Sequence, residues 1–146
     1  MFSIFKAKNN EVVRDYETIL SASRNETLYT KYNVPDTPQG RFQMIALHAA
    51  PYFGVYADRK QGPRAQKLFD MIFRDIELSF REIGVGDLAV PKKMKRYMQD
   101  FNGLMQLHAA ADADHVDITR RNVFGEEGEL PSDFEIYIKG IFDHGH

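Results

Sequence analysis

A long amphipathic stretch followed by a glycine turn constrains the fold of this chain more than any other feature. Between Pro63 and Ile83, apolar residues recur at spacings of one, three and four, which places them on one broad face of an α-helix. They are Leu68, Phe69, Ile72, Phe73, Ile76, Phe80 and Ile83. Gly84 can end this helix in a left-handed conformation, and Pro91 can begin the next one. The pattern predicts a helical hairpin whose apolar face must be covered by other helices.

The rest of the chain also reads as helical. Further periodic stretches cover residues 11–23, 27–32, 38–57, 91–111 and 130–142, and a strand is an alternative only for the last of these. We therefore expect an all-α fold, with a single compact helical domain of about five helices over residues 10–111. Residues 1–9 read as a flexible N-terminal arm. Residues 112–146 read as an acidic C-terminal extension, in which a polar linker leads to a short amphipathic segment.

Composition narrows the classes of protein that this chain can represent. The 146 residues are enough for one domain with a core of its own, and the absence of cysteine excludes disulfides and thiolate chemistry. No stretch is typical of a signal peptide or a membrane span, so we expect a cytoplasmic protein. The net charge of −2 gives no indication of nucleic-acid binding.

No pattern in the chain is typical of a catalytic or metal site. The acidic run that begins at Asp112 fails the spacing of an EF-hand, because Val116 and Asp117 stand where a ligand and a glycine are needed. His48 and His108 lie on apolar helix faces without the companion ligands of a metal site, which favours packed histidines. We therefore expect a binding protein without catalytic residues, cofactor or metal.

Charge is distributed unevenly along the chain. Residues 1–111 carry 16 basic and 12 acidic groups, whereas residues 112–146 carry 3 basic and 9 acidic groups. Lys92, Lys93, Lys95 and Arg96 cluster at the head of a predicted helix, where cations oppose the helix dipole. This cluster is either a solvated face or a basic patch for a partner, and one hypothesis is that the acidic tail lies over it. Met94, Met98 and Met105 share a stripe on the same helix that is either core or a surface that binds apolar segments.

Two stretches together resemble a known family. The first is VPDTPQGRFQMIALH at residues 34–48; the second is LFDMIFRD at residues 68–75, continuing through REIGVGDLAV at residues 81–90 to Lys92 and Lys95. In this order they resemble the ubiquinol–cytochrome c chaperone family, assembly factors for ubiquinol:cytochrome c reductase, which is respiratory complex III. The resemblance covers roughly Leu28 to His108, so it says nothing about the arm or the acidic tail.

The resemblance implies an α-helical, non-enzymatic chaperone. Such proteins bind newly made cytochrome b and hold it until haem insertion and assembly proceed. For this chain it implies a bacterial-type member, cytoplasmic and peripheral to the inner membrane, with a small accessory protein as a further candidate partner. A domain of this size can hold one loop or emerging segment of such a client but cannot enclose it.

Polar and aromatic residues within the two motifs are the candidates for the partner-binding surface. They are Arg41, Phe42, His48, Asp87, Lys92, Lys93, Lys95 and Arg96, with the basic cluster facing anionic lipid or an acidic stretch of the client. Two other interpretations stay open. One is a small helical haem-handling protein or oxidoreductase that uses His48 or His108. The other is an adaptor that binds a soluble protein.

Overall fold

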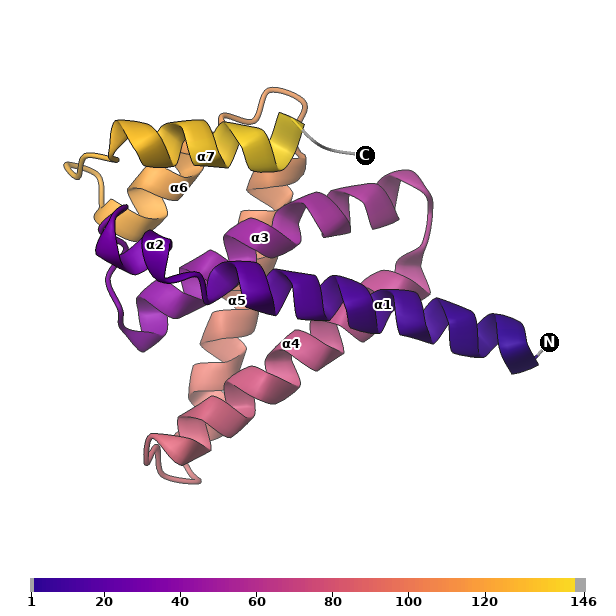
Figure 1. The fold of residues 1–146 in the computed structure, drawn as a ribbon. Coiled ribbons are helices and arrows are strands. Elements are labelled where there is room, and N and C mark those ends of the chain that lie inside the picture. Colours follow the sequence, from indigo (N-terminus) through magenta and orange to yellow (C-terminus); the bar gives the residue numbers. More distant parts are fainter. Residues whose placement is uncertain (1, 144–146) are drawn as a thin grey trace.

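The computed structural model describes residues 2–143, with side chains from Glu11 onward, and all regular structure in this range is α-helical. The helices are α1 (Phe2–Ser23), α2 (Glu26–Thr30), α3 (Pro38–Asp58), α4 (Gly62–Glu82), α5 (Val90–Ala109), α6 (His115–Phe124) and α7 (Ser132–Asp143) (Figure 1). The expected all-α class is confirmed. Five helices, α1–α5, form the part of the chain for which about five were expected, and α6 and α7 follow in the C-terminal extension. None of these seven helices is long and apolar enough to cross a membrane.

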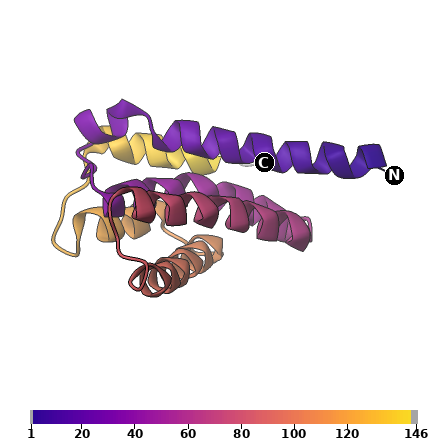
Figure 2. The same ribbon diagram turned by 90° about the horizontal axis from the view of Figure 1, so that it is seen from below.

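The larger of two cores lies where α1, α3, α4 and α5 meet. Figure 2 shows α1 on one side of α3 and α4, and α5 crossing on the other side. Five residues of the predicted α4 stripe are buried: Leu68, Ile72, Phe73, Ile76 and Phe80. They belong to the same core as the fully buried Phe101 of α5, which Phe73 meets edge-on at 5.4 Å between ring centroids. Burying such a stripe is what stabilises an amphipathic helix in a folded domain.

Two tyrosines anchor α1 within this core through carboxylates. Tyr16 of α1 donates a hydrogen bond to Asp75 of α4, and Tyr56 of α3 donates one to Asp15 of α1. Burial and the neighbouring carboxylate raise the pKa of both phenols, so both stay neutral and act as donors.

A second, smaller core joins α2, α3 and α7. Its buried residues are Leu28, Val34, Met44, Leu47, Phe134 and Ile138. Tyr32 stacks on Phe134 at 5.1 Å between ring centroids. Because α3 also supplies Phe42, Ala46 and Ala49 to the first core, it is buried on two sides and forms the wall that both cores share.

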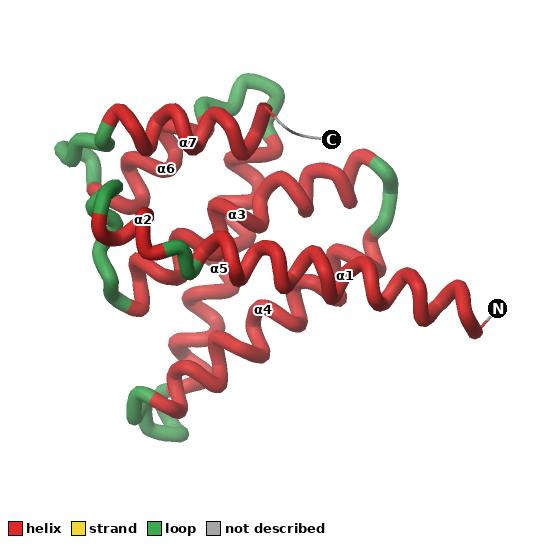
Figure 3. Tube along the Cα trace, in the orientation of Figure 1, coloured by secondary structure: helices red, strands yellow, loops and turns green. Residues whose placement is uncertain are grey.

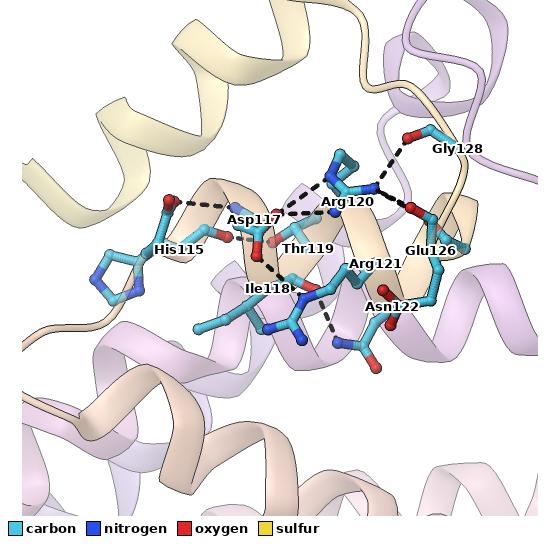
Figure 4. A network of polar contacts seen from close by, with 11 residues as sticks. His115, Asp117, Ile118, Thr119, Arg120, Arg121, Asn122, Glu126 and Gly128 are labelled. Atoms are coloured by element: carbon cyan, nitrogen blue, oxygen red, sulfur yellow. Dashed lines mark hydrogen bonds and ion pairs between the residues drawn. The ribbon is translucent and has the colours of Figure 1, made fainter.

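Helix α6 lies in the stretch that the sequence analysis assigned to a linker. Asp114 caps it by accepting a hydrogen bond from the backbone N–H of Asp117 at 3.0 Å. Arg120 then binds Asp117 at 2.9 Å and donates from Nη1 to the carbonyls of Glu126 and Gly128 at 2.9 and 3.1 Å (Figure 4). These polar contacts hold the two ends of α6, while Ile118 packs into the first core and Val116, Val123 and Phe124 pack against the second. The apolar residues are irregularly spaced, which is why hydrophobic periodicity did not indicate the helix.

The N-terminal end of the chain differs from its expected structure. Helix α1 begins at Phe2, where the sequence analysis placed a loose arm at residues 1–9; no Gly or Pro in residues 2–10 interrupts the helix. In Figure 3 its first turns extend beyond the other helices. Met1 and residues 144–146 lie outside the described residues.

The acidic tail does not lie over the basic cluster, at least as far as Asp143. Helix α7 packs on α2 and α3, and Asp133 approaches Lys31 with 3.7 Å between Oδ2 and Nζ. In Figure 1 α7 and the turn that leads into α5 are at opposite ends of the molecule. The apolar side chains of Phe134 and Ile138 position the tail, and their burial outweighs any attraction between solvated charges.

Candidate functional site

The two sequence motifs converge on one groove. The first turns of α3, the second half of α4 and the start of α5 enclose a volume of about 320 Å³. Its lining residues are Asp36, Thr37, Pro38, Arg41, Phe42, Ile45, Ile76, Ser79, Phe80, Glu82, Ile83 and Tyr97. We call it the motif groove. All of these except Tyr97 come from the two stretches at residues 34–48 and 68–90, which are far apart in sequence and meet here.

The start of α3 is built tightly, and this positions one wall of the motif groove. Thr37 is the N-cap, and its hydroxyl oxygen accepts a hydrogen bond from the backbone N–H of Gly40 at 3.0 Å. Pro38 follows in the first turn, where its missing N–H costs nothing. A Cβ on Gly40 would lie 1.8 Å from the carbonyl oxygen of Pro35, so only glycine fits where the incoming loop crosses the helix.

Arg41 lies on the rim of the groove. Its Nε donates to Asp36 at 2.7 Å, which raises the pKa of Arg41, and its guanidinium lies 5.3 Å from the centre of the Tyr29 ring. Both side chains of the ion pair are more than half exposed. Within residues 11–143 the two Nη groups of Arg41 make no hydrogen bond, so they can donate to a bound segment.

Phe42 forms part of the groove floor. It is 3% exposed and meets Tyr97 edge-on with 4.6 Å between ring centroids. Tyr97 in turn contacts Phe80 at 5.1 Å. Phe42 therefore shapes the floor from within the core, and direct contact with a partner stays a prediction for this residue.

His48 lies away from the groove, between α3 and α7. Its Nδ1 is 2.7 Å from the carbonyl oxygen of Met44, and its Nε2 is 2.6 Å from the hydroxyl of Tyr137. Because a carbonyl can only accept, Nδ1 carries the proton and Tyr137 donates to Nε2. Burial lowers the pKa of His48, which keeps the ring neutral. With both nitrogens bonded and 6% exposed, His48 joins two helices, and its predicted role in partner binding stays untested.

The remaining candidates gather at the turn between α4 and α5. Asp87 accepts a hydrogen bond from Arg81 at 2.7 Å. Lys92, Lys93, Lys95 and Arg96 are all exposed, and none forms an ion pair with a residue in the described range 11–143. The predicted site residues thus fall into three places: Arg41 and Phe42 at the groove, Asp87 and the cations at the turn, and His48 in the interior.

Several residues of this region were not anticipated. Ile83 was expected on the covered face of α4, but it follows the last helical residue, Glu82, and is 61% exposed. Leu88, which was not singled out, is 98% exposed although it is large and apolar. A signal was present in the sequence, because Leu88 stands in a turn that follows two glycines, where polar residues are usual. Ile76, Ser79, Phe80 and Tyr97 line the groove only because α3, α4 and α5 pack together, which periodicity alone does not reveal.

A second hollow lies at the C-terminal half of α3. It encloses about 650 Å³ between α3, the start of α4 and the end of α5, with His108, His115 and Phe142 at one edge. The Nδ1 atoms of the two histidines are 2.9 Å apart, and His115 stacks on Phe142 at 3.6 Å between centroids. Burial, and to a smaller extent His115, lowers the pKa of His108 to about 4, so His108 is neutral near pH 7.

Neither this pair nor any other group within residues 11–143 brings three potential metal ligands together.

The three methionines of the α5 stripe differ in their surroundings. Met94 is buried in the first core, Met98 packs partly against it, and Met105 lines the second hollow.

The sequence model of the ubiquinol–cytochrome C chaperone family matches residues 30–131. The chain belongs to this family. The match contains both motifs and also Tyr97, so it includes every residue that lines the motif groove. Family membership confirms the resemblance noted in the sequence and indicates an assembly chaperone of ubiquinol–cytochrome c reductase.

A solved structure supports the assignment across nearly the whole chaperone. The crystal structure of the Cbp3 homolog from Brucella abortus superposes with a TM-score of 0.71 and 29% sequence identity. The alignment covers 97% of this chain and 86% of that one, so it includes α6 and α7 as well as the family core. No curated protein sequence matches the chain.

Proposed function

We propose that this chaperone binds newly synthesised cytochrome b and holds one apolar segment of it in the motif groove until complex III is assembled. One observation carries the proposal: the two stretches that resemble the family fold onto a single groove. A surface formed by both stretches is the place where a common client would bind.

The groove has the chemistry that an apolar segment requires. Phe42, Ile45, Ile76 and Phe80 form an apolar floor, and Ile83 stands exposed at its mouth. Its size lies at the lower end of ligand pockets, so it receives side chains from one face of a helix or loop, and not a whole transmembrane bundle.

The polar rim of the groove can orient the segment. Arg41 offers free Nη donors on one side, and Glu82 offers a carboxylate on the other. Carbonyl oxygens at the end of a client helix need donors when they leave water, and a guanidinium supplies several in a fixed plane. The proposed work is thus binding and protection without chemistry, as expected for a non-catalytic assembly factor.

We place this activity on the cytoplasmic side of the inner membrane, where a bacterial client emerges. A small accessory protein is a further candidate partner. In this proposal Phe42 and His48 act from inside the fold: Phe42 shapes the groove floor, and His48 fixes α3 against α7.

The test is site-specific photo-crosslinking in the native host. A photoreactive residue at Ile83 should crosslink cytochrome b above other inner-membrane proteins, as identified by mass spectrometry. The same residue at Ile136 is the matched control, because Ile136 is a similarly exposed apolar residue on α7, far from the groove. Crosslinks to cytochrome b at both positions, or at neither, would contradict the groove assignment. Recovery of soluble proteins alone would favour an adaptor.

A variant adds a quantitative check. Ile83→Asp puts a charge at the mouth of the groove, and we expect it to reduce co-purification of cytochrome b by about tenfold, the effect of losing one buried apolar side chain. Ile136→Asp should leave co-purification unchanged. Both sites are exposed, so neither variant should impair folding.

A further inference from the structure

The turn between α4 and α5 combines an exposed apolar tip with a cationic face. We call residues 83–96 the α4–α5 corner. The carbonyl of Gly86 accepts hydrogen bonds from the N–H groups of Ala89 and Val90, at 2.9 and 3.2 Å, so the turn runs directly into the helix. Leu88 therefore leads the outward face of α5, and Lys92, Lys95 and Arg96 follow it at intervals of four, seven and eight residues.

Two large apolar side chains of the corner, Leu88 and Ile83, are both exposed to solvent. Leu88 is 98% exposed and Ile83 is 61% exposed. On the opposite side of α5, Val90 and Met94 are buried in the first core, so the helix cannot rotate to cover Leu88. An apolar side chain held in water by the fold is the kind of group that enters a membrane interface.

The positive charges around the tip have no acidic partners within the described part of the protein. Lys92, Lys93, Lys95 and Arg96 are exposed and form no ion pair in the range 11–143, although cations at this end oppose the dipole of α5. The nearby acid Asp87 is already paired with Arg81. Glu82 is the other carboxylate of the turn, so the cations remain in excess.

The position of the corner allows it to meet a flat surface. In Figure 1 it lies at one extremity of the molecule, with α4 and α5 running from it into the body. We propose that the α4–α5 corner docks this chaperone on an anionic lipid bilayer, with Leu88 in the interface and Lys92, Lys95 and Arg96 at lipid phosphates. A purely acidic surface would satisfy the cations but would leave the projecting Leu88 in water. A bilayer interface satisfies both.

Docking is distinct from client binding, although Ile83 borders both surfaces. A docked corner brings the mouth of the motif groove to the membrane, next to an emerging client segment. The inference needs no client, so it can be tested with lipid alone.

The experiment is co-sedimentation of the full chain with vesicles. Vesicles of phosphatidylcholine are compared with vesicles that also contain phosphatidylglycerol, at low and physiological salt. We expect binding to the anionic vesicles that weakens with salt. Lys92→Glu together with Lys95→Glu should reduce it by about 25-fold or more, since one cation near an anionic surface contributes roughly fivefold. Leu88→Ser should reduce it by about tenfold.

Two controls match these changes at sites away from the corner. Arg59→Glu together with Lys67→Glu makes the same change of net charge at exposed positions near the other end of α4. Ile136→Ser removes an exposed apolar side chain from α7. Both controls should bind as the unmodified protein does.

Three results would overturn the inference. They are equal binding to neutral and anionic vesicles, corner variants that bind as well as their controls, and capture of an acidic protein through the corner without vesicle binding. None of these results bears on crosslinking of cytochrome b at position 83, and loss of that crosslink leaves the vesicle result valid. The two proposals can therefore fail separately.

Discussion

The hydroxyl of Tyr137 donates a hydrogen bond of 2.6 Å to Nε2 of His48, and this contact joins α7 to the middle of α3. His48 belongs to the first family motif, whereas Tyr137 lies beyond the end of the family match at residue 131. The interior of the family core thus depends on a helix outside it.

Tyr137→Phe should therefore destabilise the fold. The variant leaves Nε2 of the buried His48 without a donor, and an unsatisfied buried polar atom costs about 1–3 kcal/mol. The free energy of unfolding in urea measures the loss. The matched control is Tyr97→Phe, because the hydroxyl of Tyr97 makes no hydrogen bond within residues 11–143. An equal effect of both variants would mean that the bond to His48 contributes nothing.

The buried histidines predict sensitivity to acid. Burial lowers the pKa of His48 and brings that of His108 to about 4, so the unfolded chain takes up protons first as the pH falls below its ordinary histidine pKa of about 6.5. Stability should change little between about pH 7 and pH 9 and decrease from about pH 6.5 towards pH 4. Urea unfolding at several pH values measures the slope, and His108→Asn should reduce it. A flat profile down to pH 4.5 would contradict this.

Two glycines of α3 should respond in opposite ways to the same substitution. Gly40→Ala puts a Cβ 1.8 Å from the Pro35 carbonyl oxygen, and such overpacking costs about 1–3 kcal/mol or more. Gly54→Ala meets nothing within 4 Å and should stabilise the helix by about 0.5–1 kcal/mol. Thermal unfolding of the two variants makes the comparison. Destabilisation by both would show that α3 tolerates no added methyl group.

The polar network at α6 predicts a difference between neighbouring arginines. Arg120 holds the loop at residues 125–128 through three carbonyls, whereas Arg121 contacts Asp117 from a more exposed position. Arg120→Ala should cost about 1–3 kcal/mol, and Arg121→Ala less than about 1 kcal/mol. Hydrogen exchange should show faster opening of residues 125–143 in the first variant alone. If the amides of residues 125–143 were equally protected in both variants, contacts other than those of Arg120 would hold this loop.

The fold was predictable where apolar periodicity is strong. The stripe from Leu68 to Phe80 indicated α4 and its buried face, and the sequence around Thr37 and Pro38 indicated where α3 begins. Helix α6 escaped prediction because its few apolar residues are irregularly spaced. The aspartate cap and the carbonyl contacts of Arg120 that hold its ends also have no period in the sequence.

The candidate site was predictable only in part. Motif residues such as Arg41 could be named from the sequence, but the groove exists because α3 packs against α4, and a one-dimensional pattern does not specify that pairing. The sequence favoured a packed His48, and its role as a partner-binding residue stays a prediction. The bond from Tyr137, 89 residues away, holds it inside the fold, and a one-dimensional pattern does not reveal that partner.

Helix α3 separates the two cores and contributes side chains to both, with Phe42 and Ala49 on one side and Met44 and Leu47 on the other. If either core unfolds, one side of α3 is exposed to water, and the other core loses the packing that α3 provides. The two cores are therefore coupled into one cooperative unit, and heat should melt this small chaperone in a single transition.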